Sequence, residues 1–415
     1  MKTAQATRPI VIVGAGHAGS QVAFSLRQGG YGGRIILIDG EGETPYQRPP
    51  LSKAFLTGKA EADDLRFRPV SFYEEQRIEC RVATVAQINR PTQELRLADG
   101  SVIGYGHLVL ATGGHARPLV VAGGDLAGVQ ALRTLADARR LRELMAAATR
   151  VAVVGAGFIG LEFAAVAAQR GLPVTVIETV ERPMARAVSP GISALFRDAH
   201  AGWGVQWRLG SSVQELVGSH GRVTGVRCDG GEVIAADLVV YGIGMVPNID
   251  LARTAGLDVD NGIVVDARLF TSDPAISAIG DVAVFPDAFS GRRLRLESVQ
   301  NALDQARHVA ARLLGQDQVY AACPWFWSDQ GPLKLQIAGL PALCNEFVTI
   351  GESDDAHATV LGFSNERLLA VETVNRPADH MMARRALAAG RSMTAAEARM
   401  PGFDLKAWGR VAATA

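Results

Sequence analysis

Two glycine-rich turns are the parts of this chain whose residue types and spacing best fit a chemical task. Residues 14–19 read Gly-Ala-Gly-His-Ala-Gly, and residues 155–160 read Gly-Ala-Gly-Phe-Ile-Gly. Each turn follows a short apolar run and opens a stretch with helical spacing. Such a turn needs one glycine for the tight bend, one for close approach of the backbone to a pyrophosphate, and one for packing of helix on strand. The predicted turn glycines are Gly14, Gly16, Gly19, Gly155, Gly157 and Gly160. Two such turns predict two bound dinucleotides, and electron transfer from one to the other.

An acidic residue ends the apolar run that follows each turn. Asp39 follows residues 35–38, and Glu178 follows residues 174–177. An acid at this position binds the ribose diol of its nucleotide. A carboxylate at Glu178 would repel a 2′-phosphate, which favours NADH, although Arg182 and Arg186 nearby leave NADPH open.

The composition excludes several other classes of protein. The formal net charge is +0 and hydrophobic residues make up 48% of the chain, so no global field attracts nucleic acid or an anionic membrane. The 4 cysteines are far apart and form no Cys-x-x-Cys motif, so we expect no metal site, no iron–sulfur cluster and no redox disulfide. No run is long enough to span a membrane, and the first residues lack the apolar core of a signal peptide. We therefore expect a cytoplasmic protein with no nucleic-acid or membrane partner.

The elements that must position the two turns repeat one pattern. Residues 10–39 and 151–178 both read as strand, helix, strand, and each helix ends at a glycine. A proline-stiffened loop covers residues 44–53, where a regular helix or central strand is forbidden. Apolar residues at helical spacing from Val299 to Leu313 predict a helix that stops at Gly315.

The character of the chain changes near residue 321. Short β-like runs at 333–337, 347–350 and 368–371 and a helix at 380–389 indicate a separate α+β domain. The predicted fold is α/β, with two Rossmann-like nucleotide-binding domains of the glutathione-reductase type plus this C-terminal α+β domain. The predicted boundaries are 1–115 with 245–320 for the first nucleotide-binding domain, 116–244 for the second, and 321–415 for the third domain; the resemblance described next implies that the first binds FAD and the second NAD.

Several motifs in order along the chain resemble those of the FAD-dependent ferredoxin reductases of oxygenase systems, the group that serves putidaredoxin, rhodocoxin and biphenyl-type dioxygenases. The proline loop, Tyr-Gln-Arg-Pro-Pro-Leu-Ser-Lys at 46–53, and the tryptophan segment, Pro-Trp-Phe-Trp-Ser-Asp-Gln at 324–330, are the most specific. The other matching segments are 111–113, 132–134, 155–162, 242–248, 271–281 and 297–302.

The resemblance implies which residues hold the two cofactors. It implies that FAD contacts Ala15, Asp39, Arg48, Lys53, Val82 or Ala83, Ala111, Arg133, Asp281 and Val299. It implies that NADH lies near Gly157, Ile159, Glu178, Arg186 and Gly244. Lys53 and Glu162 match an ion pair beside the flavin ring, and Trp327 matches a tryptophan on the ferredoxin-facing side of the flavin. These three are the candidate catalytic residues.

Hydride transfer needs no acid or base from the protein, so the expected task of the chain is to stack nicotinamide on flavin and to stabilise charge on the reduced ring. A helix beginning near Ser298 would direct its positive end at that charge. A ferredoxin is usually acidic, so a basic docking face is expected. The candidates for that face are Arg66, Arg68, Arg292, Arg293, Arg295, Arg307 and His308.

The function predicted from these features is NADH-dependent reduction, through FAD, of a [2Fe–2S] ferredoxin that serves a cytochrome P450 or a Rieske oxygenase. Two other readings stay open. A disulfide reductase or NADH oxidase shares the double fingerprint but uses cysteines near the flavin, and residues 40–45 contain none. A flavoprotein like apoptosis-inducing factor, which senses NADH, shares the lysine–glutamate pair. The sequence does not identify the ferredoxin, the oxygenase, its substrate or the oligomeric state.

Overall fold

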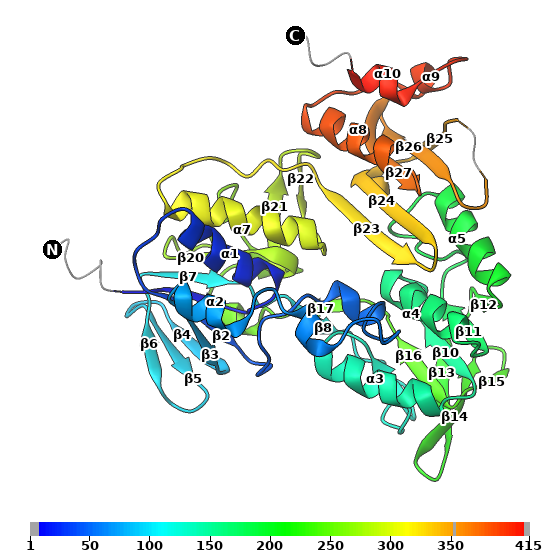
Figure 1. Ribbon diagram of the computed structural model, residues 1–415, viewed down its shortest axis with the longest axis horizontal. Helices are drawn as coiled ribbons and strands as arrows, with labels where there is room; N and C mark the ends of the chain where they lie inside the picture. The colour runs from blue at the N-terminus through cyan, green and yellow to red at the C-terminus, as the bar shows by residue number, and fades with distance from the viewer. Residues whose placement is uncertain (1–7, 352–353, 411–415) are drawn as a thin grey trace. The chain divides into compact units, whose positions relative to one another are not determined.

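The computed structural model describes residues 8–351 and 354–410, and these divide into two compact units. The first unit contains residues 8–48, 62–115 and 246–322, and the second contains residues 49–61, 116–245 and those from 323 onward. Figure 1 labels the elements of both. Strands β8 (Gly114–Ala116) and β17 (Met245–Pro247) lie where the chain passes between the units.

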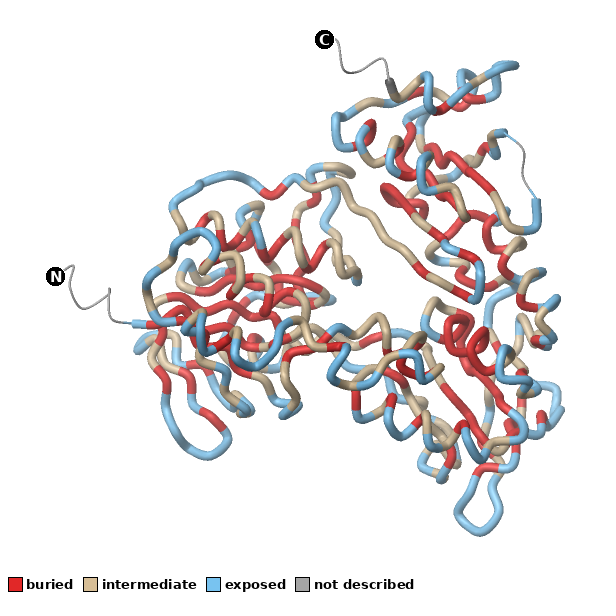
Figure 2. Tube along the Cα trace, in the orientation of Figure 1, coloured by how far each residue is buried: buried red, intermediate tan, exposed pale blue. Residues whose placement is uncertain are grey.

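A parallel sheet with the strand order β20-β7-β1-β2-β3 forms the centre of the first unit. Its strands are β1 (Ile10–Val13), β2 (Ile35–Asp39), β3 (Ile78–Val82), β7 (His107–Leu110) and β20 (Ile276–Ala278). Strand β1 is buried along its whole length, because β2 and β7 flank it and helices α1 (His17–Gln28) and α7 (Val299–Leu313) pack against each other in the same layer. Figure 2 shows this burial along the central strands.

The rest of the first unit contains a small antiparallel sheet, a small mixed sheet in which β19 and β21 are parallel, and short helices. One sheet contains β4 (Val85–Asn89), β5 (Glu94–Leu97) and β6 (Val102–Gly104). The other contains β18 (Val259–Asp260), β19 (Gly262–Val264), β21 (Ala283–Asp287) and β22 (Arg292–Leu294). The short helices are α2 (Val70–Glu75) and α6 (Asp250–Thr254).

The second unit repeats the parallel sheet with the strand order β12-β11-β10-β16-β9. Its elements are β9 (Val129–Ala131), α3 (Leu135–Ala147), β10 (Val151–Val154), α4 (Phe158–Gln169), β11 (Val174–Glu178), α5 (Pro190–Gly202), β12 (Gln206–Leu209) and β16 (Leu238–Tyr241). A side sheet contains β13 (Val213–Ser219), β14 (Arg222–Cys228) and β15 (Val233–Ala235).

The C-terminal part of the second unit is an antiparallel sheet with helices. The strand order is β23-β24-β27-β26-β25. The elements are β23 (Trp325–Gln330), β24 (Leu333–Gly339), β25 (Glu346–Thr349), β26 (Ala358–Ser364), β27 (Arg367–Val374), α8 (Pro377–Ala388), α9 (Ala395–Ala398) and α10 (Leu405–Arg410). The predicted α/β class with two Rossmann-like sheets and a C-terminal α+β part is confirmed.

The predicted helix ends are confirmed where a glycine can adopt a positive φ. Gly30 has a φ of +83° just beyond α1, and Gly315 has a φ of +98° just beyond α7. The predicted start of the last long helix, at residue 380, is wrong by three residues, because Pro377 occupies the first turn of α8 and its fixed φ suits that position. In the proline loop a short 3-10 helix covers Pro49–Ser52, a turn that the sequence analysis did not foresee.

Candidate functional site

The predicted FAD-binding residues of the first unit follow the carboxyl ends of its parallel strands, where ligands bind in open α/β sheets. Gly14 follows β1, Asp39 ends β2, Val82 ends β3 and Ala111 follows β7. Asp39 is the register partner of Val82, and the N–H of Ala83 donates to the carbonyl of Asp39 at 2.9 Å. The parallel register therefore brings together residues that are distant in the sequence.

The first glycine turn has the geometry of a phosphate cradle. Gly14 has a φ of +102°, and a Cβ built there would lie 2.2 Å from the carbonyl oxygen of Ala111. A Cβ on Gly19 would lie 1.8 Å from the carbonyl oxygen of Gly14, whereas a Cβ on Gly16 would meet no atom within 4 Å. Gly16 precedes α1 and provides no side-chain cap, so the open space beside Gly16 lies at the N-terminal end of this helix. The turn therefore has room for the pyrophosphate of a dinucleotide, which the sequence predicts to be FAD.

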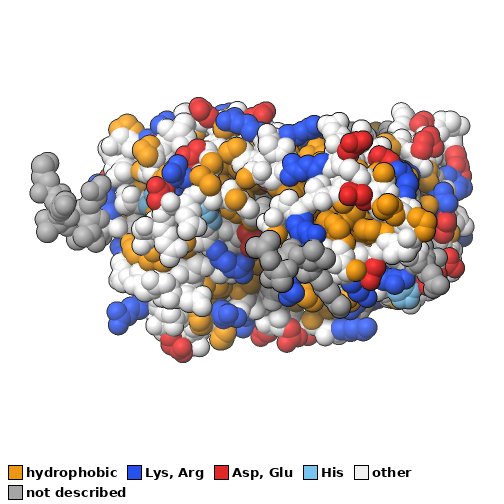
Figure 3. Space-filling view, turned by 90° about the horizontal axis from the view of Figure 1, so that it is seen from above, with side chains coloured by type: hydrophobic (Ala, Val, Ile, Leu, Met, Phe, Trp, Pro, Cys, Tyr) orange, Lys and Arg blue, Asp and Glu red, His pale blue; other side chains and the backbone are white. Residues whose placement is uncertain are grey.

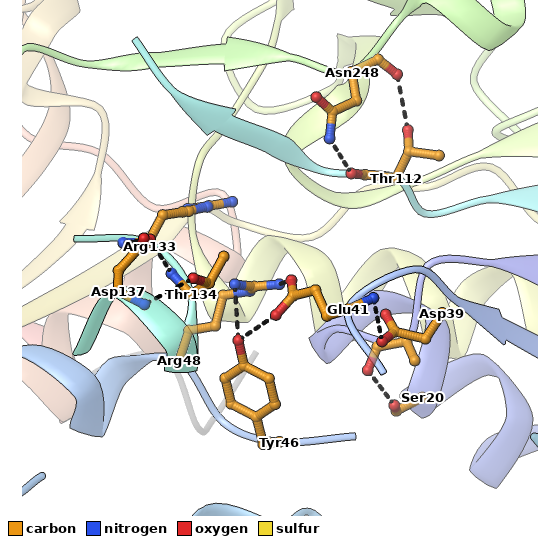
Figure 4. A network of polar contacts seen from close by, with 11 residues as sticks. Ser20, Asp39, Glu41, Tyr46, Arg48, Thr112, Arg133, Thr134, Asp137 and Asn248 are labelled. Carbon is orange, nitrogen blue, oxygen red and sulfur yellow. Dashed lines mark hydrogen bonds and ion pairs between the residues drawn. The ribbon is translucent and has the colours of Figure 1, made fainter. Parts of the chain in front are cut away.

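A network of polar side chains follows Asp39 (Figure 4). The carboxylate of Asp39 accepts from the N–H of Glu41 at 3.0 Å, and burial raises its pKa in spite of that hydrogen bond. Tyr46 donates its hydroxyl to Glu41 at 2.6 Å, and Arg48 forms an ion pair with the same Glu41. Arg48, a predicted FAD contact, is thus fixed by residues of its own unit.

Two of the matching motifs bind each other. Thr112 Oγ1 donates to the carbonyl of Asn248 at 2.9 Å, and Asn248 Nδ2 donates to the carbonyl of Thr112 at 2.9 Å (Figure 4). This double hydrogen bond joins the end of β7 to the segment after β17. These two motif residues therefore have a structural task next to the predicted FAD contact Ala111.

The remaining FAD contacts predicted for the first unit lie at the start of α7 and in a short 3-10 turn that is hydrogen-bonded to α7. Asp281 lies in a 3-10 turn, Gly280–Val282, and the N–H of Gly280 donates to Gln305 on α7 at 2.7 Å. Val299 is the first residue of α7, and the Ser298 hydroxyl caps that helix by accepting from the N–H of Asn301 at 3.0 Å. The predicted helix start at Ser298 is confirmed.

The second glycine turn has the same geometry as the first. Gly155 has a φ of +99° and a Cβ there would lie 2.6 Å from the carbonyl oxygen of Gly242. A Cβ on Gly160 would lie 2.2 Å from the carbonyl oxygen of Gly155, but a Cβ on Gly157 would be no closer than 3.8 Å to any neighbour. This turn also fits a pyrophosphate, so the second unit has its own dinucleotide cradle.

The other residues predicted to hold NADH lie at the same edge of the second parallel sheet. Glu178 ends β11 and accepts from the N–H of Ala156, inside the glycine turn, at 2.7 Å. Gly244 follows β16 and is exposed, with a φ of +112°. Ile159 on α4 is 44% exposed and Arg186 is exposed, which leaves both side chains accessible to a ligand.

The loop after Glu178 is fixed by the C-terminal sheet. Glu372 on β27 is 1% exposed, and its Oε1 and Oε2 accept from the N–H of Ser189 at 2.9 and 3.2 Å. Ser189 in turn caps α5. Burial raises the pKa of Glu372 to about 7 from an ordinary value of 4.5. The hydrogen bonds from Ser189 and the positive charge of Arg182 lower this pKa by less than burial raises it.

This buried carboxyl predicts a pH dependence of stability. Between pH 4.5 and 7 the folded chain holds a proton that the unfolded chain releases, so stability falls as pH rises through this window. Across this window the contribution of Glu372 to the free energy of unfolding falls by roughly 3 kcal/mol. We expect Glu372→Gln to raise the unfolding midpoint in denaturant at pH 8 and to leave it nearly unchanged at pH 4.5. The surface variant Glu74→Gln is the control, and an E372Q midpoint equal to wild type at pH 8 would contradict the assignment.

The predicted catalytic pair is formed within the second unit. Lys53 Nζ lies 2.5 Å from Glu162 Oε2, although the two residues come from the proline loop and from α4. Glu162 is 4% exposed, whereas the Lys53 side chain is 23% exposed and also donates to the carbonyl of Pro49 at 3.3 Å. A buried carboxylate thus holds an ammonium group that remains partly accessible.

Trp327 and Arg133 also belong to the second unit. The ring of Trp327 on β23 lies 5.8 Å from that of Trp325, and the next residue on the strand, Ser328, donates to Glu162 at 2.7 Å. Arg133 precedes α3, and its N–H donates to Asp137 at 3.0 Å beside the capping box that Asp137 forms with Thr134 (Figure 4).

Sequence reasoning missed two hydroxyl groups at the catalytic pair. Ser52 and Ser328 both donate to Glu162, and both lie inside motifs that had been singled out for their prolines and tryptophans. Their positions next to Lys53 and Trp327 were the available signal. Nothing in the spacing indicated that both would reach the same carboxylate.

The residues expected to form a basic docking face carry less unpaired positive charge than their number indicates. Arg66, Arg295 and Arg307 each form an ion pair with a nearby acid. Burial lowers the pKa of His308, so it adds no positive charge at neutral pH. Figure 3 shows basic and acidic side chains mixed over the face seen there.

Over residues 8–351 and 354–410, no group of His, Cys, Asp or Glu has the arrangement of a metal site. Over the same residues, no helix has the length and apolar character needed to cross a membrane.

Comparisons with known proteins give the following matches. The family model for pyridine nucleotide-disulphide oxidoreductases matches residues 8–306, and the model named Reductase C-terminal matches residues 325–408. Rhodocoxin reductase of Rhodococcus erythropolis is 48% identical over 398 residues, which cover 96% of this chain and 93% of that protein. The crystal structure of the ferredoxin reductase for the CYP199A2 system of Rhodopseudomonas palustris is 47% identical, with a TM-score of 0.94 and coverage of 97% and 100%. Putidaredoxin reductase, in its covalent complex with putidaredoxin, is 40% identical, with a TM-score of 0.93 and coverage of 97% and 98%.

Proposed function

The chain belongs to the pyridine nucleotide-disulphide oxidoreductase family, and from this premise we propose that it is an NADH-dependent ferredoxin reductase containing FAD. The observation that carries the proposal is the pair of dinucleotide cradles, at Gly14–Gly19 and Gly155–Gly160, each with open space at its central glycine. When bound, NADH supplies a hydride and FAD accepts it and passes its electrons on singly.

The tasks of the chain in this function are to bind and to orient. The glycine turns and helix starts hold the two pyrophosphates, and Asp39 and Glu178 hold ribose hydroxyls. The ammonium of Lys53, fixed by Glu162, stabilises negative charge on the reduced flavin ring. The start of α7 supports the same charge with its positive end. The proposal keeps the roles that the resemblance implies for the other predicted contacts. These are Arg48, Val82 or Ala83, Arg133, Arg186, Gly244 and Trp327.

The electron acceptor in this proposal is a [2Fe–2S] ferredoxin that serves a cytochrome P450 or a Rieske oxygenase. The support comes from the relatives, one of which forms a covalent complex with putidaredoxin and another of which serves a P450 system by its name. The three-domain division predicted from the sequence and a cytoplasmic location belong to the same proposal. The four cysteines of the chain are all free thiols, as a reducing compartment would leave them.

The alternative of a disulfide reductase or NADH oxidase is not favoured by the thiols. Burial raises the pKa of Cys80 to about 11 and that of Cys344 to about 12, and burial also raises the pKa of Cys228. Such thiols stay protonated at neutral pH, whereas redox-active cysteines need a thiolate. The family name therefore describes the fold and the cofactors better than it describes the chemistry of this chain.

The test of the proposal uses the purified chain with FAD, NADH and cytochrome c. We expect rapid reduction of cytochrome c only when a [2Fe–2S] ferredoxin is added, because the ferredoxin carries single electrons between the two proteins. Reduction at the same rate without ferredoxin would contradict the assigned acceptor. Flavin that NADH reduces but no candidate ferredoxin reoxidises would favour the NADH-sensing reading.

Removal of the Lys53 ammonium is expected to slow reduction of the flavin. Lys53→Ala leaves the buried Glu162 carboxylate without its cation and withdraws positive charge from the reduced ring. We expect the rate constant of flavin reduction by NADH to fall about 100-fold, in line with the loss of one electrostatic contact. Stopped-flow absorbance at the flavin band measures it. Lys59→Ala, an exposed lysine nearby in the sequence, is the control, and wild-type kinetics in K53A would remove the pair from the mechanism.

A further inference from the structure

Three donors from separate parts of the sequence hold the Glu162 carboxylate. Lys53 Nζ and Ser52 Oγ both lie 2.5 Å from Oε2, and Ser328 Oγ donates to Oε1 at 2.7 Å. Glu162, Ser52 and Ser328 are 4%, 2% and 0% exposed. Because the carboxylate and both serines are buried, each hydroxyl helps to fix the orientation of the carboxylate.

The contacts continue from Ser328 to helix α5. Gln330 Nε2 donates to Ser328 Oγ at 3.4 Å, and Gln330 Oε1 lies 2.9 Å from His200 Nε2. Burial lowers the pKa of His200 to about 4, so its ring is neutral at pH 7 and has one N–H to donate. Only the Nε2–H tautomer satisfies Gln330 Oε1.

Because the amide nitrogen of Gln330 can only donate and the carboxylate of Glu162 can only accept, the directions of the remaining hydrogen bonds are determined as well. His200 donates to Gln330, Gln330 donates to Ser328, and Ser328 must donate to Glu162. Gln330, His200 and Ser328 are all fully buried, so solvent does not compete for these hydrogen bonds in the folded chain. The Ser328 hydroxyl therefore has one orientation, in which its O–H points at Glu162 Oε1.

We infer that Ser328 is a positioning residue for the Lys53–Glu162 pair, with Ser52 as its counterpart on the other carboxylate oxygen. The inference rests on the proposed function, in which that pair lies beside the flavin ring. Hydroxyl donors on both oxygens fix the plane of the carboxylate, and the carboxylate fixes the ammonium of Lys53. Ser328 lies on β23, within the region matched by the Reductase C-terminal model, so this region contributes directly to the candidate site.

The test compares flavin reduction with NADH binding. Ser328→Ala leaves Glu162 Oε1 without a donor, so the carboxylate can rotate and Lys53 moves with it. We expect the rate constant of flavin reduction by NADH to fall about tenfold, while the Kd of NADH stays within about twofold of wild type. The position of Lys53 affects hydride transfer to the flavin, whereas the contacts that bind NADH are unchanged. We also expect a more negative midpoint potential of bound FAD, measured by dye equilibration without NADH. A role limited to folding would not produce this combination.

Three further variants separate positioning from general damage to the fold. Ser52→Ala removes the other hydroxyl and should show the same direction of change in rate and potential. Ser328→Thr keeps the hydroxyl and should restore both values toward wild type. Thr373→Val removes a fully buried hydroxyl from β27 of the same sheet, where it donates to the carbonyl of Gln336 at 3.2 Å, and should behave as wild type.

The outcomes distinguish this inference from the proposed function. If NADH reduces the wild-type flavin rapidly and S328A and S52A match it in rate and potential, the positioning role is overturned and the proposed function stands. If NADH does not reduce the wild-type flavin, the proposed function fails, and the midpoint potentials alone decide the inference. If S328A does not fold, S52A decides it by the same two measurements.

Discussion

Gly16→Ala is expected to give a folded protein that purifies without flavin. A methyl group at this position meets no protein atom within 4 Å, so the chain itself accepts it. The same space is where the backbone must approach a pyrophosphate, and the methyl group would occupy it. We expect FAD affinity to fall by at least about 100-fold, which corresponds to about 3 kcal/mol. The visible flavin spectrum after gel filtration in the presence of FAD, together with circular dichroism, measures the two effects.

The chain offers matched controls for this variant. Gly157→Ala occupies the equivalent position in the second turn, so it should keep its yellow colour and lose affinity for NADH. Gly191→Ala, on helix α5, also has no neighbour within 4 Å and should retain both cofactors. Gly14→Ala should fail to fold, because its Cβ would lie 2.2 Å from the carbonyl oxygen of Ala111 at a φ of +102°. A yellow G16A protein with wild-type affinity for FAD would remove the first turn from the site.

Glu178→Arg is expected to change the nucleotide preference of the second site. A hydrogen bond from a ribose hydroxyl to a carboxylate contributes about 1.5–3 kcal/mol, so its loss should lower kcat/KM for NADH by roughly 10- to 100-fold. An arginine there should attract the 2′-phosphate that the carboxylate repels, and kcat/KM for NADPH should rise. Steady-state ferredoxin reduction with each nucleotide measures the ratio.

A second variant at position 178 is needed because the Glu178 carboxylate also binds the glycine turn. Glu178 also accepts from the N–H of Ala156 at 2.7 Å, so the arginine variant loses a contact within the turn as well. Glu178→Gln keeps an acceptor for that N–H and removes only the charge. We expect an intermediate preference in E178Q, and an unchanged ratio of NADPH to NADH use in both variants would refute the ribose contact.

The parts of the site that depend on short-range geometry could be predicted from the sequence. The bend at Gly14 needs a positive φ, and Asp39 follows directly from the end of a strand, so residue type and spacing identify both. The start of α7 at Ser298 and its end before Gly315 follow from the same kind of local rule. Lys53 and Glu162 were identified only through resemblance, because their separation in the sequence carries no geometric information.

The tertiary structure alone decided which groups surround the predicted catalytic pair, Lys53 and Glu162. Ser328 is 166 residues from Glu162 and Ser52 is 110 residues from it, and Glu372 is 183 residues from the Ser189 N–H that it binds. Hydrogen-bond partners at such separations depend on how strands and helices pack, and a buried donor and acceptor find each other only after the packing has excluded water. The sequence by itself therefore determined two nucleotide cradles and the acids that follow them, because the bend of each glycine turn and the succession of strand, helix and strand around it are local. Which hydroxyl groups hold the carboxylate of Glu162 was determined only when the C-terminal sheet packed against helix α4.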